Sequence, residues 1–91
     1  MSLRKFDGSN LNFYKEKMHD YLIVKGQIAP IEYENVAEGY KPNEWTKMDW
    51  IVHATIRMNL FESIYYMVQS CMTTFELWKA LSNTYEKKVP A

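Results

Sequence analysis

The stretch NEWTKMDWIVHATIRMNL, residues 43–60, is predicted to form a helix at the centre of the fold. Its side chains recur three and four positions apart, which is the spacing of one face of an α-helix. That face consists of Trp45, Met48, Val52, Thr55, Ile56, Asn59 and Leu60, and it is widened by Trp50, Ile51 and Met58. We expect the helix over 44–60, with Asn43 as its N-cap and Glu44 in the first turn, where the helix dipole favours a carboxylate. A face of this width predicts a central position.

A second helix is predicted upstream, over residues 11–25. Helical spacing is followed there by Leu11, Tyr14, Met18, Tyr21, Leu22 and Lys25, and the helix ends at Gly26, a residue typical of the position after a helix. Before it, Asp7 and Gly8 are expected to form a turn, and Ser9 or Asn10 to cap the helix. We expect Phe6 to pack against the core and to set the direction in which the chain enters the helix.

Two further helices are predicted downstream. Residues 62–69 have enough apolar side chains for a short helix, namely Ile64, Met67 and Val68. Thr73 and Glu76 then match a capping box, in which a hydroxyl is followed three residues later by a carboxylate. The helix expected after this box covers 75–86, and its apolar residues are Phe75, Leu77, Trp78, Leu81 and Tyr85.

Residues 27–42 are predicted to form an ordered acidic loop between the first two long helices. Pro30 and Gly39 interrupt helical spacing there, and the acidic residues are Glu32, Glu34 and Glu38. The apolar side chains of the loop are expected to hold it against the core, with or without a short turn of helix near Ile31. The whole pattern predicts an all-α fold, a compact bundle of about four helices in a single domain over 1–91.

The composition narrows the class of protein. Eleven basic and eleven acidic residues give a net charge of zero, so strong attraction to nucleic acid or to an acidic membrane is not expected. No apolar stretch approaches the roughly 20 residues that span a bilayer, and no signal peptide is recognised after Met1. The one cysteine, Cys71, has no disulfide partner in the chain. These features favour a reduced, intracellular environment without membrane contact.

No catalytic, cofactor-binding or metal-binding residues are predicted. His19, His53 and Cys71 lie on three different elements and lack the spacing of metal ligands. No basic residue stands next to Cys71 in sequence to lower the pKa of its thiol. The glycines are isolated rather than gathered in a phosphate-binding loop. We therefore expect that the chain is not an enzyme and requires no cofactor.

Aromatic side chains interleaved with lysines raise the question of RNA binding, because such side chains can stack on bases. The residues concerned are Phe6, Phe13, Tyr14, Lys15 and Lys17. The alternative, which we favour, is that Tyr14 belongs to the core and the lysines to the helix surface. With zero net charge, any contact with RNA through this segment is expected to be weak.

Surplus aromatic rings point instead to contact with another protein. Trp50, Tyr65 and Tyr66 are the candidate interface residues, because Trp and Tyr predominate at binding hot spots. Charge is also segregated along the chain: residues 1–26 hold five basic and three acidic groups, whereas residues 27–49 hold two basic and five acidic groups. Such segregation favours head-to-tail contacts between identical subunits.

The order of these segments resembles the N-terminal, capsid-like part of Gag polyproteins of copia-type LTR retrotransposons, especially those of plants. The resemblance covers nearly the whole chain in three segments, KFDGSNLNFYKEKMHDYL, EWTKMDWIVHATIRMNL and TTFELWKALSNTYE. Its matching residues are Phe6, Asp7, Gly8, Asn10, Lys15, Met18, Leu22, Trp45, Asp49, Ala54, Leu60, Thr73, Glu76, Leu77, Trp78, Leu81 and Tyr85, with Ile56 near the usual aliphatic position. Tyr14 stands where the family has Trp, and Gln27-Ile28 where it has Leu-Trp.

The resemblance implies a structural protein that associates with itself into virus-like particles in the cytoplasm. It also implies that residues 1–91 form the N-terminal domain of a longer chain, in which RNA is bound by a zinc knuckle beyond Ala91. An alternative remains open, in which a host protein retains such a domain to bind a peptide or protein in a groove between the helices predicted over 11–25 and 44–60.

Overall fold

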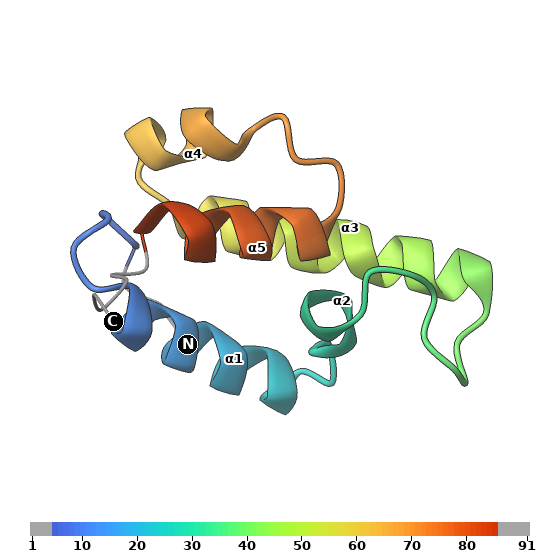
Figure 1. The fold of residues 1–91 in the computed structure, drawn as a ribbon. Helices are drawn as coiled ribbons and strands as arrows, with labels where there is room; N and C mark the ends of the chain where they lie inside the picture. Colours follow the sequence, from blue (N-terminus) through green and yellow to red (C-terminus); the bar gives the residue numbers. More distant parts are fainter. Residues whose placement is uncertain (1–4, 86–91) are drawn as a thin grey trace, which may run out of the picture.

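Five α-helices form the bundle in the computed structural model, which describes residues 5–85 (Figure 1). They are α1 (Leu11–Val24), α2 (Ala29–Glu32), α3 (Pro42–Met58), α4 (Glu62–Val68) and α5 (Thr74–Tyr85). No strand occurs in the described part of the chain, and the predicted all-α class is confirmed. The ends of the predicted domain and the last residue of the helix expected over 75–86 lie outside the described residues.

Helix α5 packs against three of the other helices. In Figure 1, α5 runs across the middle of the bundle, in front of α3 and between α1 and α4, and it packs against α2, α3 and α4. The prediction that Trp50, Ile51 and Met58 widen the buried face of residues 44–60 is wrong, because all three side chains are exposed.

The core draws side chains from every helix and from the chain before α1. Its buried cluster consists of Phe6, Leu11, Tyr14, Met18, Leu22, Ile31, Val52, Ile56, Leu60, Ile64, Val68, Leu77 and Leu81. In α1 the buried residues recur at the predicted helical spacing, and in α3 they are Trp45, Val52, His53 and Ile56. One face of each long helix thus supplies the apolar area that stabilises the bundle.

Phe6 joins the start of the chain to the junction between α3 and α4. Its N–H donates to the carbonyl of Asn59 at 2.8 Å, and its carbonyl accepts from the N–H of Phe61 at 3.1 Å. These two bonds make an isolated parallel bridge with Leu60. The ring is buried and stacks on Tyr14, with 5.0 Å between ring centroids. The expectation that Phe6 packs against the core is confirmed.

Asn10 is the N-cap of α1, and its Oδ1 accepts from the N–H of Phe13 at 3.2 Å. Ser9, the other predicted cap, instead directs its N–H and its hydroxyl to Asp7 Oδ1.

Asn10→Ala is expected to lower the free energy of unfolding by about 0.5–2 kcal/mol, as measured by urea denaturation. Ser9→Ala is the matched control and should have the smaller effect; an equal loss in both variants would contradict the cap.

Helix α3 begins two residues earlier than predicted, and its N-cap is Lys41 rather than Asn43. Pro42 occupies the first helical position, where its missing N–H leaves no hydrogen bond unmade and its fixed φ suits the helix. Glu44 accepts from the N–H of Lys41 at 3.4 Å. A proline next to a candidate cap is thus the stronger signal, because it belongs inside the first turn.

The predicted acidic loop contains helix α2, at the place where a short helical turn was one of the two expectations. Ala29, Pro30 and Ile31 are buried, and these residues hold the segment to the core. Tyr33 and Val36 are exposed instead. The expectation that apolar side chains hold this segment to the core is therefore met by α2 but not by Tyr33 and Val36, whereas the partly buried Tyr40 packs against the ring of Trp45.

The buried hydroxyl of Tyr14 predicts a loss of stability in alkaline solution. Burial raises the pKa of Tyr14 above its ordinary value, so the tyrosine of the unfolded chain ionises first. Its contribution to stability is complete below about pH 10 and falls above it, by about 1.4 kcal/mol per pH unit. Urea denaturation at about pH 9 and about pH 11 measures this. Tyr14→Phe should lose less stability between the two pH values, and an equal loss in both proteins would contradict the assignment.

Candidate functional site

The residues that carry the family resemblance meet in one place, the core and its edges. The buried members are Phe6, Tyr14, Met18, Leu22, Trp45, Ile56, Leu60, Leu77 and Leu81. Ala54 and Trp78 are partly buried. Turns and helix starts hold five further members, namely Asp7, Gly8, Asn10, Thr73 and Glu76. Tyr85 ends α5, and its side chain lies outside the described part of the structure. Most of these residues therefore build the fold, and only Lys15 and Trp78 also line a pocket.

Asp49 connects α3 to the start of α5. Its Oδ1 accepts from the N–H of Thr74 at 3.0 Å, and its carbonyl accepts from the Thr74 hydroxyl at 2.8 Å. Thr74 is fully buried and Asp49 is partly buried, so both contacts are partly shielded from water. The carboxylate also lies at the positive end of the α5 dipole. Sequence reasoning matched Asp49 to the family pattern without finding this role.

The predicted capping box at the start of α5 is present in part. Thr73 Oγ1 accepts from the N–H of Glu76 at 3.2 Å, as expected. Glu76 Oε2 accepts from the N–H of Met72 at 3.0 Å, rather than from the N–H of Thr73. The carboxylate therefore holds the chain one residue further back, where the segment from α4 enters α5.

His53 and Cys71 lie side by side, although sequence gave no reason to expect it. The Nε2 atom of His53 is 3.0 Å from the backbone carbonyl of Cys71. The pKa of the Cys71 thiol is raised by burial and by the nearby Glu76 carboxylate. Because the thiolate is the reactive form of cysteine, this arrangement does not activate Cys71 as a nucleophile. Between residues 5 and 85, no three His, Cys, Asp or Glu side chains gather closely enough to hold a metal ion.

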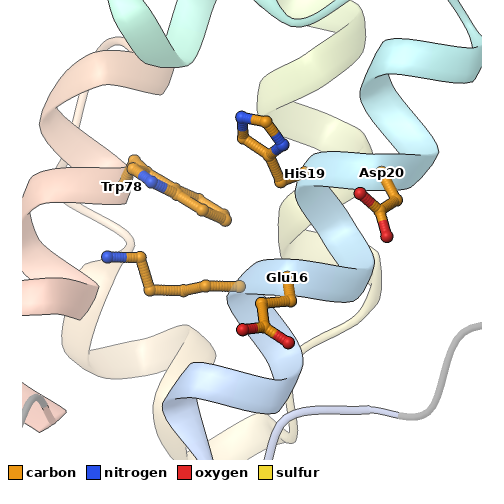
Figure 2. Close-up of a pocket in the computed structure, with 5 residues that line it drawn as sticks. Glu16, His19, Asp20 and Trp78 are labelled. Carbon is orange, nitrogen blue, oxygen red and sulfur yellow. The ribbon is translucent and has the colours of Figure 1, made fainter.

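An open groove of about 490 Å³ lies between α1 and α5 (Figure 2). It is lined by Lys15, Glu16, His19, Asp20 and Trp78. Lys15 reaches across it, with Nζ 2.9 Å from Ser82 Oγ and 5.8 Å from the centre of the Trp78 ring. The lysine is therefore held within the protein, between the two helices.

The burial and contacts of these side chains show which of the aromatic and basic residues considered for RNA binding are exposed. Phe6 and Tyr14 are buried, which leaves no face of either ring for a base to stack on. Lys15 is held against α5. Phe13 is exposed, and Lys17 Nζ lies 5.5 Å from its ring centre. The core position of Tyr14, the interpretation favoured from the sequence, is confirmed.

The three aromatic residues proposed for an interface differ in exposure. Trp50 on α3 is 70% exposed and Tyr66 on α4 is 58% exposed. Tyr65 is partly buried, packs against the core and lies beneath the Arg57 guanidinium, 6.0 Å from its carbon to the ring centre. Trp50 and Tyr66 are therefore available for contact with another molecule, whereas most of Tyr65 is not.

In the part of the chain that the structure describes, the fold is a small all-helical domain. Its candidate functional features are large apolar side chains exposed on the surface, such as Trp50 and Tyr66, rather than a cluster of polar side chains. Comparison of the chain with protein-family models, with curated proteins and with solved structures finds no match. In the described part of the chain, none of the helices has the length and apolar character needed to cross a membrane.

Proposed function

We propose that this domain is a structural, non-enzymatic module that associates with itself, as the capsid-like part of a copia-type Gag does. The ordered family pattern of three segments supports the proposal, because residues from all three pack into one core. The observation that carries it is the exposure of large apolar side chains outside that core. Trp50 is 70% exposed and Met58 is 75% exposed on the same helix, an arrangement typical of a protein-binding surface.

The proposal includes a cytoplasmic setting and a contribution to virus-like particles within a longer chain. Self-association is tested by sedimentation velocity on a dilution series of the purified domain, and of the longer chain where its reading frame is known. The expected result is a mean mass that rises with concentration. A mass equal to that of one chain at every concentration, in both proteins, would overturn the proposal.

A second candidate is a domain retained by a host protein to bind a peptide or another protein. The groove between α1 and α5 favours it, since Trp78 and Lys15 line an open hollow of about 490 Å³. This groove is not the one expected from the sequence, which placed it between the segments 11–25 and 44–60. Pull-down from cell lysate separates the candidates: a single stoichiometric foreign partner that Trp78→Ala abolishes supports this one.

A further inference from the structure

Helix α3 has a second apolar stripe on the side that faces away from the core. Trp50, Ile51, Ala54 and Met58 lie within about 100° of the helix circumference at 3.6 residues per turn. The buried residues Val52 and Ile56 are roughly opposite. Trp50 is 70%, Ile51 42% and Met58 75% exposed, and Ala54 is partly exposed. No other helix of residues 5–85 covers this stripe.

We propose that a second copy of this chain packs on the stripe, with the two α3 helices antiparallel and a two-fold axis at Ala54. This inference rests on the proposed self-association and names its interface. Two-fold contacts require a surface that is complementary to itself. The stripe meets this requirement because it is apolar on both sides of a single small residue.

The spacing of the side chains shows the complementarity. Trp50 lies four positions before Ala54 and Met58 four positions after it. In an antiparallel pair, Trp50 of one copy and Met58 of the other therefore lie at the same level, once at each end of the contact. A thioether against an aromatic ring is a favourable contact. The alanine at the axis allows the helices to approach to roughly 8–10 Å between axes.

Charge complementarity continues this pairing beyond the apolar stripe. Lys47 is exposed one turn before Trp50, on the same side of α3. Phe61 and Glu62 come shortly after Met58 in the chain and are exposed at the start of α4, where Glu62 Oε1 accepts from the Tyr66 hydroxyl at 3.3 Å. The antiparallel arrangement brings Lys47 of one copy toward Phe61 and Glu62 of the other, where a cation can meet a ring and a carboxylate. An unrelated partner would have to supply both halves of this pattern itself.

The contact is small and closes at two copies. One helix face covers less than the roughly 800 Å² per partner of a standard interface, so the dimer is expected to be weak and to depend on concentration. Because a two-fold contact does not propagate, larger assemblies would need a second surface.

The first test measures the dimer by sedimentation velocity. Trp50→Ala and Met58→Ala should each weaken dimerisation about tenfold or more. Met72→Ala is the matched control, because Met72 is 81% exposed but lies outside α3. Circular dichroism on each variant shows whether the helices are retained. The Trp50 and Met58 side chains are largely exposed, so their truncation should leave the fold intact.

The second test uses a disulfide to locate the axis. In a Cys71→Ser background, Ala54→Cys places a thiol where each copy faces its own equivalent, so mild oxidation should give a covalent dimer. Lys79→Cys, on the exposed side of α5, is the control and should cross-link far less.

The outcomes separate this inference from the proposed function. Wild-type protein that self-associates, with Trp50→Ala unchanged and no preferential cross-link at position 54, would overturn the α3 interface and leave self-association standing. Wild-type protein that stays monomeric at every concentration would overturn both. A binding partner other than a second copy on this stripe would also contradict the two-fold arrangement.

Discussion

Met18→Ala is expected to lower the free energy of unfolding by about 2–5 kcal/mol, which is the range for a methionine truncated in a well-packed core. Met18 is fully buried on α1 and belongs to the central cluster that also contains Leu77 and Leu81 of α5. Alanine favours the helix slightly more than methionine does, so helix propensity offsets little of the loss. A small domain has only about 5–15 kcal/mol of stability, and the variant should therefore melt far below the wild type.

The matched control is the same substitution on an exposed helical position. Met67 on α4 is 61% exposed, and Met67→Ala should change the free energy of unfolding by about 0.5 kcal/mol or less. Urea denaturation followed by circular dichroism measures both variants. If Met18→Ala were no more destabilising than Met67→Ala, the packing of α1 against the bundle would be wrong.

Asp49→Ala is expected to lower the free energy of unfolding by about 1.5–3 kcal/mol. The substitution removes the charged carboxylate that accepts from the N–H of Thr74. It leaves the N–H of this fully buried residue without a partner, and an unsatisfied buried donor lowers stability. It also removes a negative charge from the start of α5, where the helix dipole favours one. Both effects fall on the contact that fixes α5 against α3.

Two comparison variants isolate the role of Asp49. Asp49→Asn keeps an oxygen acceptor in the same place, so it should retain part of the lost stability. Asp20→Ala removes an exposed carboxylate from the middle of α1 and should have little effect. Thermal melting and urea denaturation measure all three. Equal stability of Asp49→Ala and Asp20→Ala would show that the bond between α3 and α5 contributes nothing.

Local signals explain which parts of the fold could be predicted from the sequence. Gly26 adopts a positive φ of 69° directly after the C-cap of α1, so the end of that helix could be predicted from this one residue. Thr73 and Asn10 marked helix starts in the same way. The prediction of Asn43 as the N-cap of α3 was wrong because its neighbour Pro42 already occupies the first helical turn. In each case the deciding interaction lies within four residues in the chain.

Contacts between distant residues could not be predicted in this way. The bond from Thr74 to Asp49 spans 25 positions, and no periodic pattern encodes it. The approach of His53 to Cys71 likewise depends on how α3 meets the segment before α5. Helix α2 has only four residues, too few for periodicity to reveal.

Only part of the candidate interface on α3 could be predicted from the sequence, and for a different reason. Trp50 and Met58 are as apolar as the buried residues of α3, and periodicity alone does not say which of two apolar stripes on one helix faces the core. The prediction that Trp50 was surplus to the core agrees with its exposure, whereas Ile51, Ala54 and Met58 were not recognised as its neighbours on the same surface.

The bridge between Phe6 and Leu60 has a practical consequence for labelling the protein. It places the chain at Lys5 beside Asn59, next to Met58 at one end of the exposed α3 stripe. A bulky fluorescent or affinity domain fused at the start of the chain would therefore be tethered, through Phe6, to the junction of α3 and α4. Untagged protein, or a small dye attached to an α5 position such as Lys79, is the safer reporter, and a negative two-hybrid result with N-terminal fusions would carry little weight.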